Sequence, residues 1–324
     1  MAEPDVEKRI WMYRKMTEAK MFEERVAELM MSGQLETFYL AQRGQECSSV
    51  ALGACLRKDD ATVTTYRGLC DQLAKGVDPE RILAEIYGRD AGICHGRGGA
   101  MHYMDWDVHT FATGVVGGGI PIVVGLAFAA KYKQTDAVAA CIFGDGATDH
   151  GTFHESLNCA SLWDLPVVFL CQNNGYGEAT AQAQHQKKKD ISERAAAYDM
   201  PGITVDGNDA DACYEVISEA VERARAGDGP TLVEAKTYRL MGHFVGDPMV
   251  YMPADEVAEA KAADPVPRYR QRLIDEGVLS EGDATAFEQD LVVRLDRAVE
   301  NAKASPYPSL DTLTDHVYAG NAYF

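Results

Sequence analysis

The sequence lacks two features that would mark a membrane-spanning or nucleic-acid-binding protein. It has no apolar run long enough to span a bilayer, which takes roughly 20 residues. It has no basic stripe either, since 31 Lys and Arg residues stand against 50 Asp and Glu residues, for a formal net charge of −19. Binding to nucleic acid or to an anionic membrane depends on clustered cations. We therefore expect neither partner and interpret the acidic residues as a solvated surface.

The cysteines lack the CxxC spacing of redox and zinc motifs. The chain has eight of them, scattered along its length, and Cys141 and Cys171 stand inside apolar runs, where a buried free thiol is the ordinary state. The first residues, MAEPDVEKR, are acidic and polar, unlike a signal peptide or an Arg-rich transit peptide. These absences together predict a protein of the reducing cytoplasm.

No internal repeat, low-complexity stretch or long linker divides the chain. Its 324 residues, 46% of them hydrophobic, can bury a sizeable core. Strands alternate with helices, which predicts an α/β fold with a parallel sheet. We expect a single domain over residues 1–324, with a helical N-terminal arm over about 1–33 and a helical tail over about 254–324.

One stretch organises the chain, residues 141–177: CIFGDGATDHGTFHESLNCASLWDLPVVFLCQNNGYG. It predicts a strand, a turn around Asp145, a helix, a second strand and a turn at Asn173-Asn174. Consecutive parallel strands bring their carboxyl ends to one edge of the sheet, so Asp145 and Asn174 should lie close together. Carboxylate and amide oxygens, with a backbone carbonyl, suit Mg²⁺ or Ca²⁺ that carries phosphate oxygens. The stretch therefore predicts a site for a metal diphosphate.

Two further residues stand where predicted strands end. Arg67 closes the strand predicted over residues 60–67 and could bind a phosphate in bidentate fashion, although a surface ion pair is the plainer interpretation. His243 follows the strand predicted over residues 231–237, on a loop flanked by glycines. A histidine at this edge of the sheet is either a structural residue or a proton carrier.

The Gly-rich residues 88–105, GRDAGICHGRGGAMHYMD, have neither helical nor strand periodicity. They could form a mobile loop, a backbone nest for an anion or a metal site. His95 and His102 are not at a usual ligand spacing, which disfavours the metal. We prefer a structural loop that shapes a wall of the active site. For the polar residues 178–197 we expect a solvated loop.

A GDG turn alone is common, but GDG after an apolar strand, then a helix, a second apolar strand and NN, is the pattern of the thiamine diphosphate motif. From about residue 10 to 315 the chain resembles the alpha subunit of the two-subunit thiamine-dependent 2-oxo acid and acetoin dehydrogenases. The resemblance is carried by GRDAGICHGRGGAMHYMD, GDGATDHGTFHESLN, LPVVFLCQNNGYG and TYRLMGHFVGDP. It implies the thiamine-diphosphate-binding fold, a parallel sheet with helices on both faces.

The resemblance also implies which residues hold thiamine diphosphate and its Mg²⁺. The metal ligands would be Asp145, Asn174 and the Tyr176 carbonyl. His243 would stabilise the diphosphate and assist proton or acyl transfer, as a catalytic residue. The other contacts to the diphosphate and the aminopyrimidine would come from Tyr66, Arg67, Gly114, Val116 and the backbone of Gly146 and Ala147.

The implied activity needs a second chain. In this family the cofactor's thiazolium carbon becomes the nucleophile, and the Glu that activates it belongs to the beta subunit. We find no equivalent in this chain, so we expect an enzyme of two alpha and two beta subunits that is active only when assembled. The resemblance implies cleavage of a carbon–carbon bond next to a carbonyl and passage of the acyl group to a lipoyl-bearing acyltransferase.

The substrate would be a small ketone or 2-oxo acid. Phe244 directly after His243 resembles acetoin-type sequences, whereas pyruvate-type sequences usually carry Ser there. Two segments depart from the family pattern near the predicted mouth of the site, residues 39–43 and Tyr251-Met252. The alternatives are a pyruvate or branched-chain 2-oxo acid dehydrogenase alpha subunit and, in another class, a non-catalytic scaffold that binds a Mg-diphosphate.

Overall fold

A seven-stranded sheet forms the centre of the structure, a computed structural model that describes residues 3–315. All neighbouring strands are parallel except the first pair at one edge, which is antiparallel. In spatial order the strands are β2 (Met104–Asp105), β3 (Thr110–Thr113), β1 (Ala61–Thr65), β4 (Ala139–Gly144), β5 (Val167–Asn173), β9 (Thr231–Lys236) and β8 (Gly202–Asp206). A separate hairpin pairs β6 (Tyr176–Gly177) with β7 (Thr180–Ala181).

The central strands are apolar along their length because both faces of the sheet are covered. Every residue of β5 is buried, and β4 is buried except for Gly144. Successive side chains of β4 point to opposite faces, with Ile142 in one core cluster and Cys141 and Phe143 in the other.

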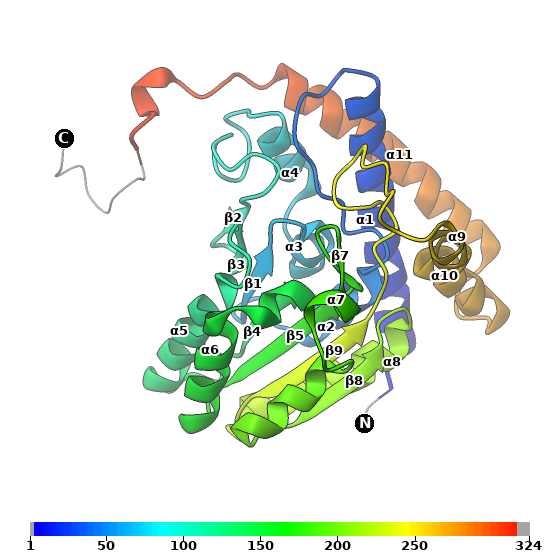
Figure 1. The fold of residues 1–324 in the computed structure, drawn as a ribbon. Coiled ribbons are helices and arrows are strands. Elements are labelled where there is room, and N and C mark those ends of the chain that lie inside the picture. The colour runs from blue at the N-terminus through cyan, green and yellow to red at the C-terminus, as the bar shows by residue number, and fades with distance from the viewer. Residues whose placement is uncertain (1–2, 316–324) are drawn as a thin grey trace.

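Helices cover both faces, as the resemblance implied (Figure 1). The second core cluster is closed by α5 (Gly119–Tyr132), α6 (Gly151–Leu162) and a 3₁₀ helix, Ile191–Tyr198. The first cluster is closed by a larger set: α1 (Val6–Met31), α2 (Glu46–Cys55), α3 (Leu69–Lys75), α4 (Pro79–Ile86), α8 (Ala210–Ala226), α10 (Pro265–Asp275) and α11 (Glu281–Ala304). The remaining helices are α7 (Gln182–His185), α9 (Ala254–Ala262) and the 3₁₀ turns Asp145–Asp149 and Leu310–Thr312.

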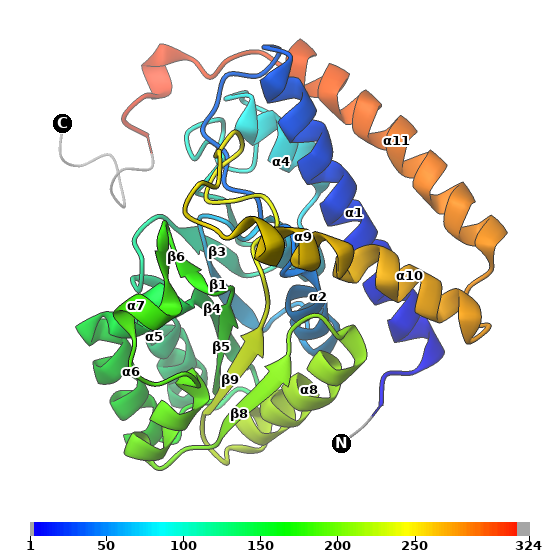
Figure 2. The same ribbon diagram turned by 45° about the vertical axis from the view of Figure 1, so that its right-hand side comes forward.

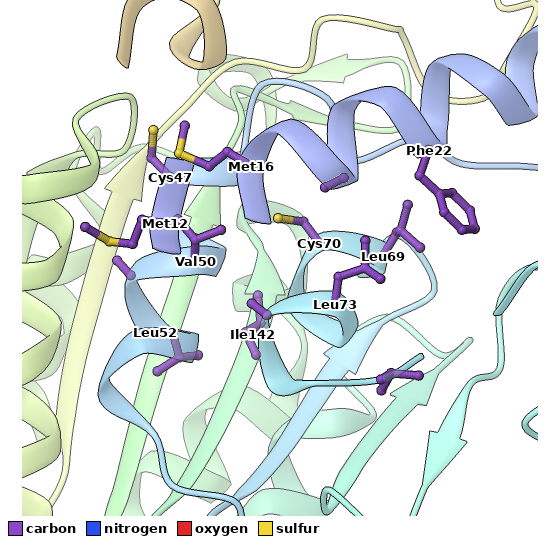
Figure 3. Packing of buried hydrophobic residues seen from close by; sticks show 14 of the residues in the cluster. Met12, Met16, Phe22, Cys47, Val50, Leu52, Leu69, Cys70, Leu73 and Ile142 are labelled. Atoms are coloured by element: carbon purple, nitrogen blue, oxygen red, sulfur yellow. The ribbon is translucent and has the colours of Figure 1, made fainter. Parts of the chain in front are cut away.

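The N-terminal arm and the helical tail form an outer layer over α2 and α3. Met12 and Met16 of α1 pack over α2, as Figure 3 shows, and Ile142 of β4 belongs to the same cluster. In turn α10 and α11 pack against α1 (Figure 2). Arg25 of α1 lies 2.8 Å from Asp296 of α11, which adds an ion pair to the apolar contact.

Most elements that the sequence predicts are confirmed to within a few residues, but two details differ. The sequence did not indicate α3 or the short strands β2 and β3. Residues 178–197 are not merely a solvated loop, because β7, α7 and a 3₁₀ helix run through them. The last part of the predicted tail, 316–324, and residues 1–2 lie outside the described residues.

The structure also describes two features that the sequence raised, membrane-spanning helices and the state of the cysteines. Within residues 3–315, no helix combines the length and the apolar character that crossing a membrane requires. All eight cysteines lie in this described part, and each is a free thiol, five of them buried.

Candidate active site

A cavity of about 320 Å³ opens at the carboxyl ends of four neighbouring strands, β1, β4, β5 and β9. This is the edge where ligands of open parallel sheets bind. The GDG and NN turns therefore meet there although α6 separates them in sequence. The loops after the four strands contribute residues 65–67, residues 144–147, Asn174 with residues 176–178, and Arg239 with His243.

Asp145 places a carboxylate in the wall of this cavity. Its residue is 1% exposed, and its Oδ2 has no hydrogen-bond partner among residues 3–315. Burial raises the pKa of the Asp145 carboxyl, and the neighbouring His185 opposes that rise. A buried carboxylate oxygen that makes no hydrogen bond is costly. A bound cation would remove this cost, so the site is suited to one.

Asn174 and Tyr176 bring two more oxygens to the same wall. The Asn174 amide donates to Gln45 Oε1 at 3.1 Å, and its Oδ1 accepts from the Tyr176 N–H at 3.2 Å. Between them Gly175 has a φ of +83°, which glycine adopts without strain. Among the described residues no group of three His, Cys, Asp or Glu could hold a metal. A cation here would depend on the mixed set of carboxylate, amide and carbonyl oxygens.

Arg67 is buried, so the interpretation as a surface ion pair is wrong. Its Nη1 donates to the Ala41 carbonyl at 2.8 Å, and its Nη2 donates to the His243 carbonyl at 3.0 Å. No salt bridge to Arg67 occurs within the described chain. Burial, with repulsion from Arg239, lowers the pKa of Arg67 to about 10. Its charge is available to an anionic ligand.

Arg239 is a second buried guanidinium on the cavity wall, and the sequence analysis missed it. It donates to the Glu178 carbonyl at 2.6 Å and to the Tyr251 hydroxyl at 2.9 Å. Its Nε has no partner within residues 3–315. The sequence pattern that pointed to Arg67 also applies to Arg239, because each arginine comes shortly after the end of a strand, β1 and β9 respectively. Two buried guanidiniums in one cavity predict an anionic ligand.

The loop that carries His243 is held by Asp247. The Asp247 carboxylate accepts from the His243 N–H at 2.7 Å, the Met249 N–H at 2.9 Å and the Tyr251 hydroxyl at 2.5 Å. Burial raises the pKa of Asp247, but these hydrogen bonds outweigh burial and the net shift is downward. Burial and repulsion from Arg67 and Arg239 lower the pKa of His243 below its ordinary 6.5.

Of the residues predicted for the cofactor, all but one line the cavity. The exception is Gly114, which stands next to the lining residues Val115, Val116 and Gly117. A Cβ on Gly114 would lie 2.5 Å from His102 Nε2, so this glycine allows the His102 ring to pack against the backbone. The residues predicted to bind the cofactor or metal that line the cavity are Tyr66, Arg67, Val116, Asp145, Gly146, Ala147, Asn174, Tyr176 and His243.

The Gly-rich loop is a backbone nest, but the chain fills it with its own carboxylate. Glu85 of α4 is fully buried, and its Oε2 accepts from the N–H groups of Cys94 at 2.7 Å and Gly96 at 2.9 Å. Its Oε1 accepts from Gly98 at 2.6 Å and Gly99 at 3.2 Å. The structural role is therefore favoured over an external anion. His102 of this loop packs against Gly114, which is next to lining residues of the cavity. No residue of the loop itself lines the cavity in the described chain.

Comparison with known proteins places this site in a family. The sequence profile described as Dehydrogenase E1 component matches residues 13–311. The alpha subunit of acetoin:2,6-dichlorophenolindophenol oxidoreductase from Bacillus subtilis (strain 168) is 44% identical over 314 residues, 96% of this chain and 94% of the relative. The protein of the same name from Cupriavidus necator is 37% identical, over 97% of this chain and 95% of the relative.

Pyruvate dehydrogenases are also similar. The chloroplastic E1 component subunit alpha-3 from Oryza sativa subsp. japonica is 36% identical over 97% of this chain and 76% of the relative. These matches span nearly the whole described fold, including the loops after β1, β4, β5 and β9 at the cavity. The chain therefore belongs to the dehydrogenase E1 component family and is similar to its alpha subunits.

Proposed function

We propose that this chain is the alpha subunit of a dehydrogenase that cleaves acetoin with thiamine diphosphate and Mg²⁺. Membership of the E1 family implies thiamine diphosphate. One observation carries the proposal: a single cavity combines the buried Asp145 carboxylate, whose Oδ2 makes no hydrogen bond within residues 3–315, with the buried guanidiniums of Arg67 and Arg239. These charges complement a divalent cation and a diphosphate.

The residues present fit both groups. Asp145, Asn174 and the Tyr176 carbonyl would hold Mg²⁺, since all three offer hard oxygen donors. The backbone at Gly146 is open, because a Cβ there would meet only Gly177 Cα at 3.6 Å. Diphosphate oxygens could therefore approach the Gly146 N–H closely. Arg67 and Arg239 are already hydrogen-bonded in place, so binding would need little reorganisation of either.

His243 can donate a proton from a definite atom. Its Nδ1 lies 3.2 Å from Arg67 Nη2, and a guanidinium can only donate, so Nδ1 accepts. With its pKa lowered, the imidazole is neutral near pH 7, and its one proton is on Nε2. From Nε2, His243 could thus donate a hydrogen bond to the diphosphate or to an oxygen of the transferred acyl group. Thiamine diphosphate itself supplies the carbon nucleophile when bound.

An apolar surface next to the cavity supports assembly with a beta subunit. Exposed residues on and around α5 and α6 form it, and we call it the α5–α6 apolar face: Val115, Ile122, Phe128, Tyr132, Leu162 and Trp163. Phe128 contacts Trp163 with ring centroids 5.6 Å apart. Val115 belongs to this face and to the cavity wall, so a chain seated here would reach the active site. Two relatives are named as alpha subunits, which implies a beta subunit as their partner. The beta subunit is therefore the proposed occupant of this face.

The substrate assignment depends on the relatives and on the loop of His243. Two acetoin oxidoreductase subunits are 44% and 37% identical to the chain, and a pyruvate dehydrogenase subunit is 36% identical. Phe244, which follows His243, packs on Phe38 with ring centroids 5.4 Å apart. A pyruvate or branched-chain 2-oxo acid dehydrogenase is the second candidate, favoured by the pyruvate-type relatives. In either case the acyl group would pass to a lipoyl-bearing acyltransferase.

The test is turnover by the chain co-expressed with its beta subunit, in the presence of thiamine diphosphate and Mg²⁺. We expect acetoin to reduce a dye such as dichlorophenolindophenol. Good turnover of pyruvate without turnover of acetoin would favour the second candidate. Failure of the assembled complex to cleave any small ketone or 2-oxo acid would indicate the non-catalytic scaffold.

Cofactor binding gives a separate test of the site. Asp145→Ala removes the carboxylate proposed to hold Mg²⁺, so we expect the Mg²⁺-dependent affinity for thiamine diphosphate to fall below detection. Calorimetry on the assembled complex measures it directly. An unchanged affinity would contradict the assignment of Asp145.

A further inference from the structure

His185 joins the site from the polar segment that the sequence analysis interpreted as a solvated loop. It ends α7, and its side chain is 19% exposed. Its Nε2 lies 3.3 Å from Asp145 Oδ2, a close polar contact, although neither atom makes a hydrogen bond within residues 3–315. Its other ring nitrogen, Nδ1, lies 2.6 Å from Asp149 Oδ2. Arg194 Nη2 then lies 3.5 Å from Asp149 Oδ1.

We infer that His185 is a positioning residue for a divalent cation, acting through Asp145. This inference rests on the proposed function, because it takes Asp145 as the carboxylate ligand of that cation. In this arrangement His185 restrains one oxygen of the Asp145 carboxylate. Asp149 anchors the His185 imidazole, and Arg194 anchors Asp149. The restrained carboxylate keeps its second oxygen for the metal.

The segment around His185 is built against the Asp145 turn. Gln186 Nε2 donates to the Asp145 carbonyl at 2.9 Å and to Thr148 Oγ1 at 2.8 Å. Arg194 Nη1 donates to the Thr148 carbonyl at 2.6 Å. These three contacts fix α7 and the 3₁₀ helix Ile191–Tyr198 against the turn formed by residues 145–149. The position of His185 is thus set by its neighbours and does not depend on its own contact with Asp145.

A lone carboxylate ligand can rotate about its side chain, and an outer partner in contact with one of its oxygens limits that freedom before the metal arrives. Loss of such an outer partner commonly weakens metal binding about 10- to 100-fold.

Mn²⁺ is a suitable probe, because its paramagnetic resonance signal reports both affinity and ligands. We would titrate Mn²⁺ into the assembled alpha–beta complex with thiamine diphosphate and compare His185→Phe, His185→Gln and the control His154→Phe. His154 also hydrogen-bonds a neighbour, the Tyr198 hydroxyl at 2.5 Å, but it is exposed on α6. Circular dichroism would establish that each variant is folded.

We expect His185→Phe to weaken Mn²⁺ binding about 10- to 100-fold. His154→Phe should leave the affinity within about twofold, the scatter usual among independent sites. His185→Gln should recover part of the loss, since its amide can donate to Asp145. Asp149→Asn should weaken binding as well, and the double variant Asp149→Asn/His185→Phe should bind no worse than His185→Phe alone, because both changes interrupt one chain of contacts.

Three outcomes would overturn the inference. Wild-type affinity in His185→Phe would show that the contact does not act on the metal. A directly coordinated nitrogen in the pulsed resonance spectrum of the wild type, lost in His185→Phe, would make His185 a ligand and not a positioning residue. Failure of the wild type to bind Mn²⁺ with thiamine diphosphate would remove the proposed function, and this inference with it.

Discussion

Glu23 of α1 is a buried carboxyl that has hydrogen bonds but no ion pair among the described residues. It accepts from the Gln42 N–H at 2.7 Å, next to the Ala41 carbonyl that holds Arg67. Burial raises its pKa from 4.5 to about 8, and the Gln42 N–H opposes this rise. Glu23 thus links the outer helix α1 to the segment behind the cavity, and its protonation couples to stability.

This coupling predicts that the free energy of unfolding depends on pH. The folded chain keeps the Glu23 proton up to about pH 8, whereas the unfolded chain loses it near pH 4.5. The contribution of Glu23 to stability is therefore complete below about pH 4.5 and is lost as the pH rises to about 8, at up to about 1.4 kcal/mol per pH unit. Glu23→Gln should remove this loss and be more stable than the wild type at pH 7.

Denaturant unfolding at several pH values between 5 and 8 measures the difference. The advantage of Glu23→Gln should shrink toward pH 5. Glu24→Gln is the matched control, because Glu24 is the next residue of α1 and is exposed. A stability gap that does not change with pH, or a similar gap for the control, would argue against the buried carboxyl as its source.

Arg239 and His243 give a second prediction at the scale of single residues. Repulsion from Arg239 is one cause of the lowered pKa of His243, after burial and Arg67. Arg239→Gln should therefore raise the pKa of His243. Titration of the His243 ring signal by NMR measures the change, with His243→Gln used to assign the resonance. A pKa that stays the same or falls would exclude Arg239 as a source of repulsion.

At the scale of elements, the Gly-rich loop depends on one side chain of α4. Four backbone N–H groups of this loop converge on the Glu85 carboxylate. Gly92 also faces it, where a Cβ would lie 2.3 Å from Glu85 Oε2. The conformation of this loop follows from a carboxylate in helix α4, since the loop itself has no regular backbone pairing. Glycines are needed where the backbone surrounds that carboxylate.

Glu85→Gln tests this dependence. The amide keeps one acceptor oxygen but turns a donor toward two of the N–H groups, and each unmet N–H costs about 1–3 kcal/mol. Hydrogen exchange at Cys94, Gly96, Gly98 and Gly99 should accelerate about tenfold or more. Glu80→Gln, on the same helix, should leave these four amides unchanged. Equal protection in Glu85→Gln and the wild type would mean that other contacts order the loop.

At the scale of the whole molecule, the described part of this acidic chain exposes a concentrated apolar face on and around α5 and α6. Helix α5, GIPIVVGLAFAAKY, is apolar on nearly all sides, which is typical of a helix buried in the complete assembly. Yet Tyr132 at its end is 80% exposed and Ile122 is 50% exposed. Figures 1 and 2 place α5 and α6 far from α11. The assembly therefore should bury the α5–α6 apolar face and leave α11 accessible.

Charged substitutions on the α5–α6 apolar face and on α11 test which of the two surfaces binds the beta subunit. We expect Ile122→Glu or Tyr132→Glu to weaken association with the beta subunit at least about 30-fold, because central interface residues commonly contribute about 2 kcal/mol or more. Val293→Glu on α11, where Val293 is 67% exposed, is the matched control and should have no effect. Light scattering with size-exclusion chromatography measures the masses. Complexes that form normally with Ile122→Glu and Tyr132→Glu would place the beta subunit elsewhere.

The sequence by itself determined the class of fold and the place of the site. Alternating strands and helices require a parallel sheet, and the GDG and NN turns follow adjacent strands, so their side chains meet at one edge. The same strand-end argument applies to Arg67 and His243, and it would have found Arg239. Each of these predictions needs only local pattern and strand order.

Only the tertiary structure decided which distant side chains meet. His185 touches Asp145 because Gln186 and Arg194 hold α7 on the 3₁₀ turn, and nothing in the polar sequence 178–197 marks that contact. Glu85 fills the Gly-rich nest because α4 points it inward, so a loop suited to an external anion already holds an internal one. Such contacts depend on the packing of whole elements, which the order of residues along the chain does not reveal.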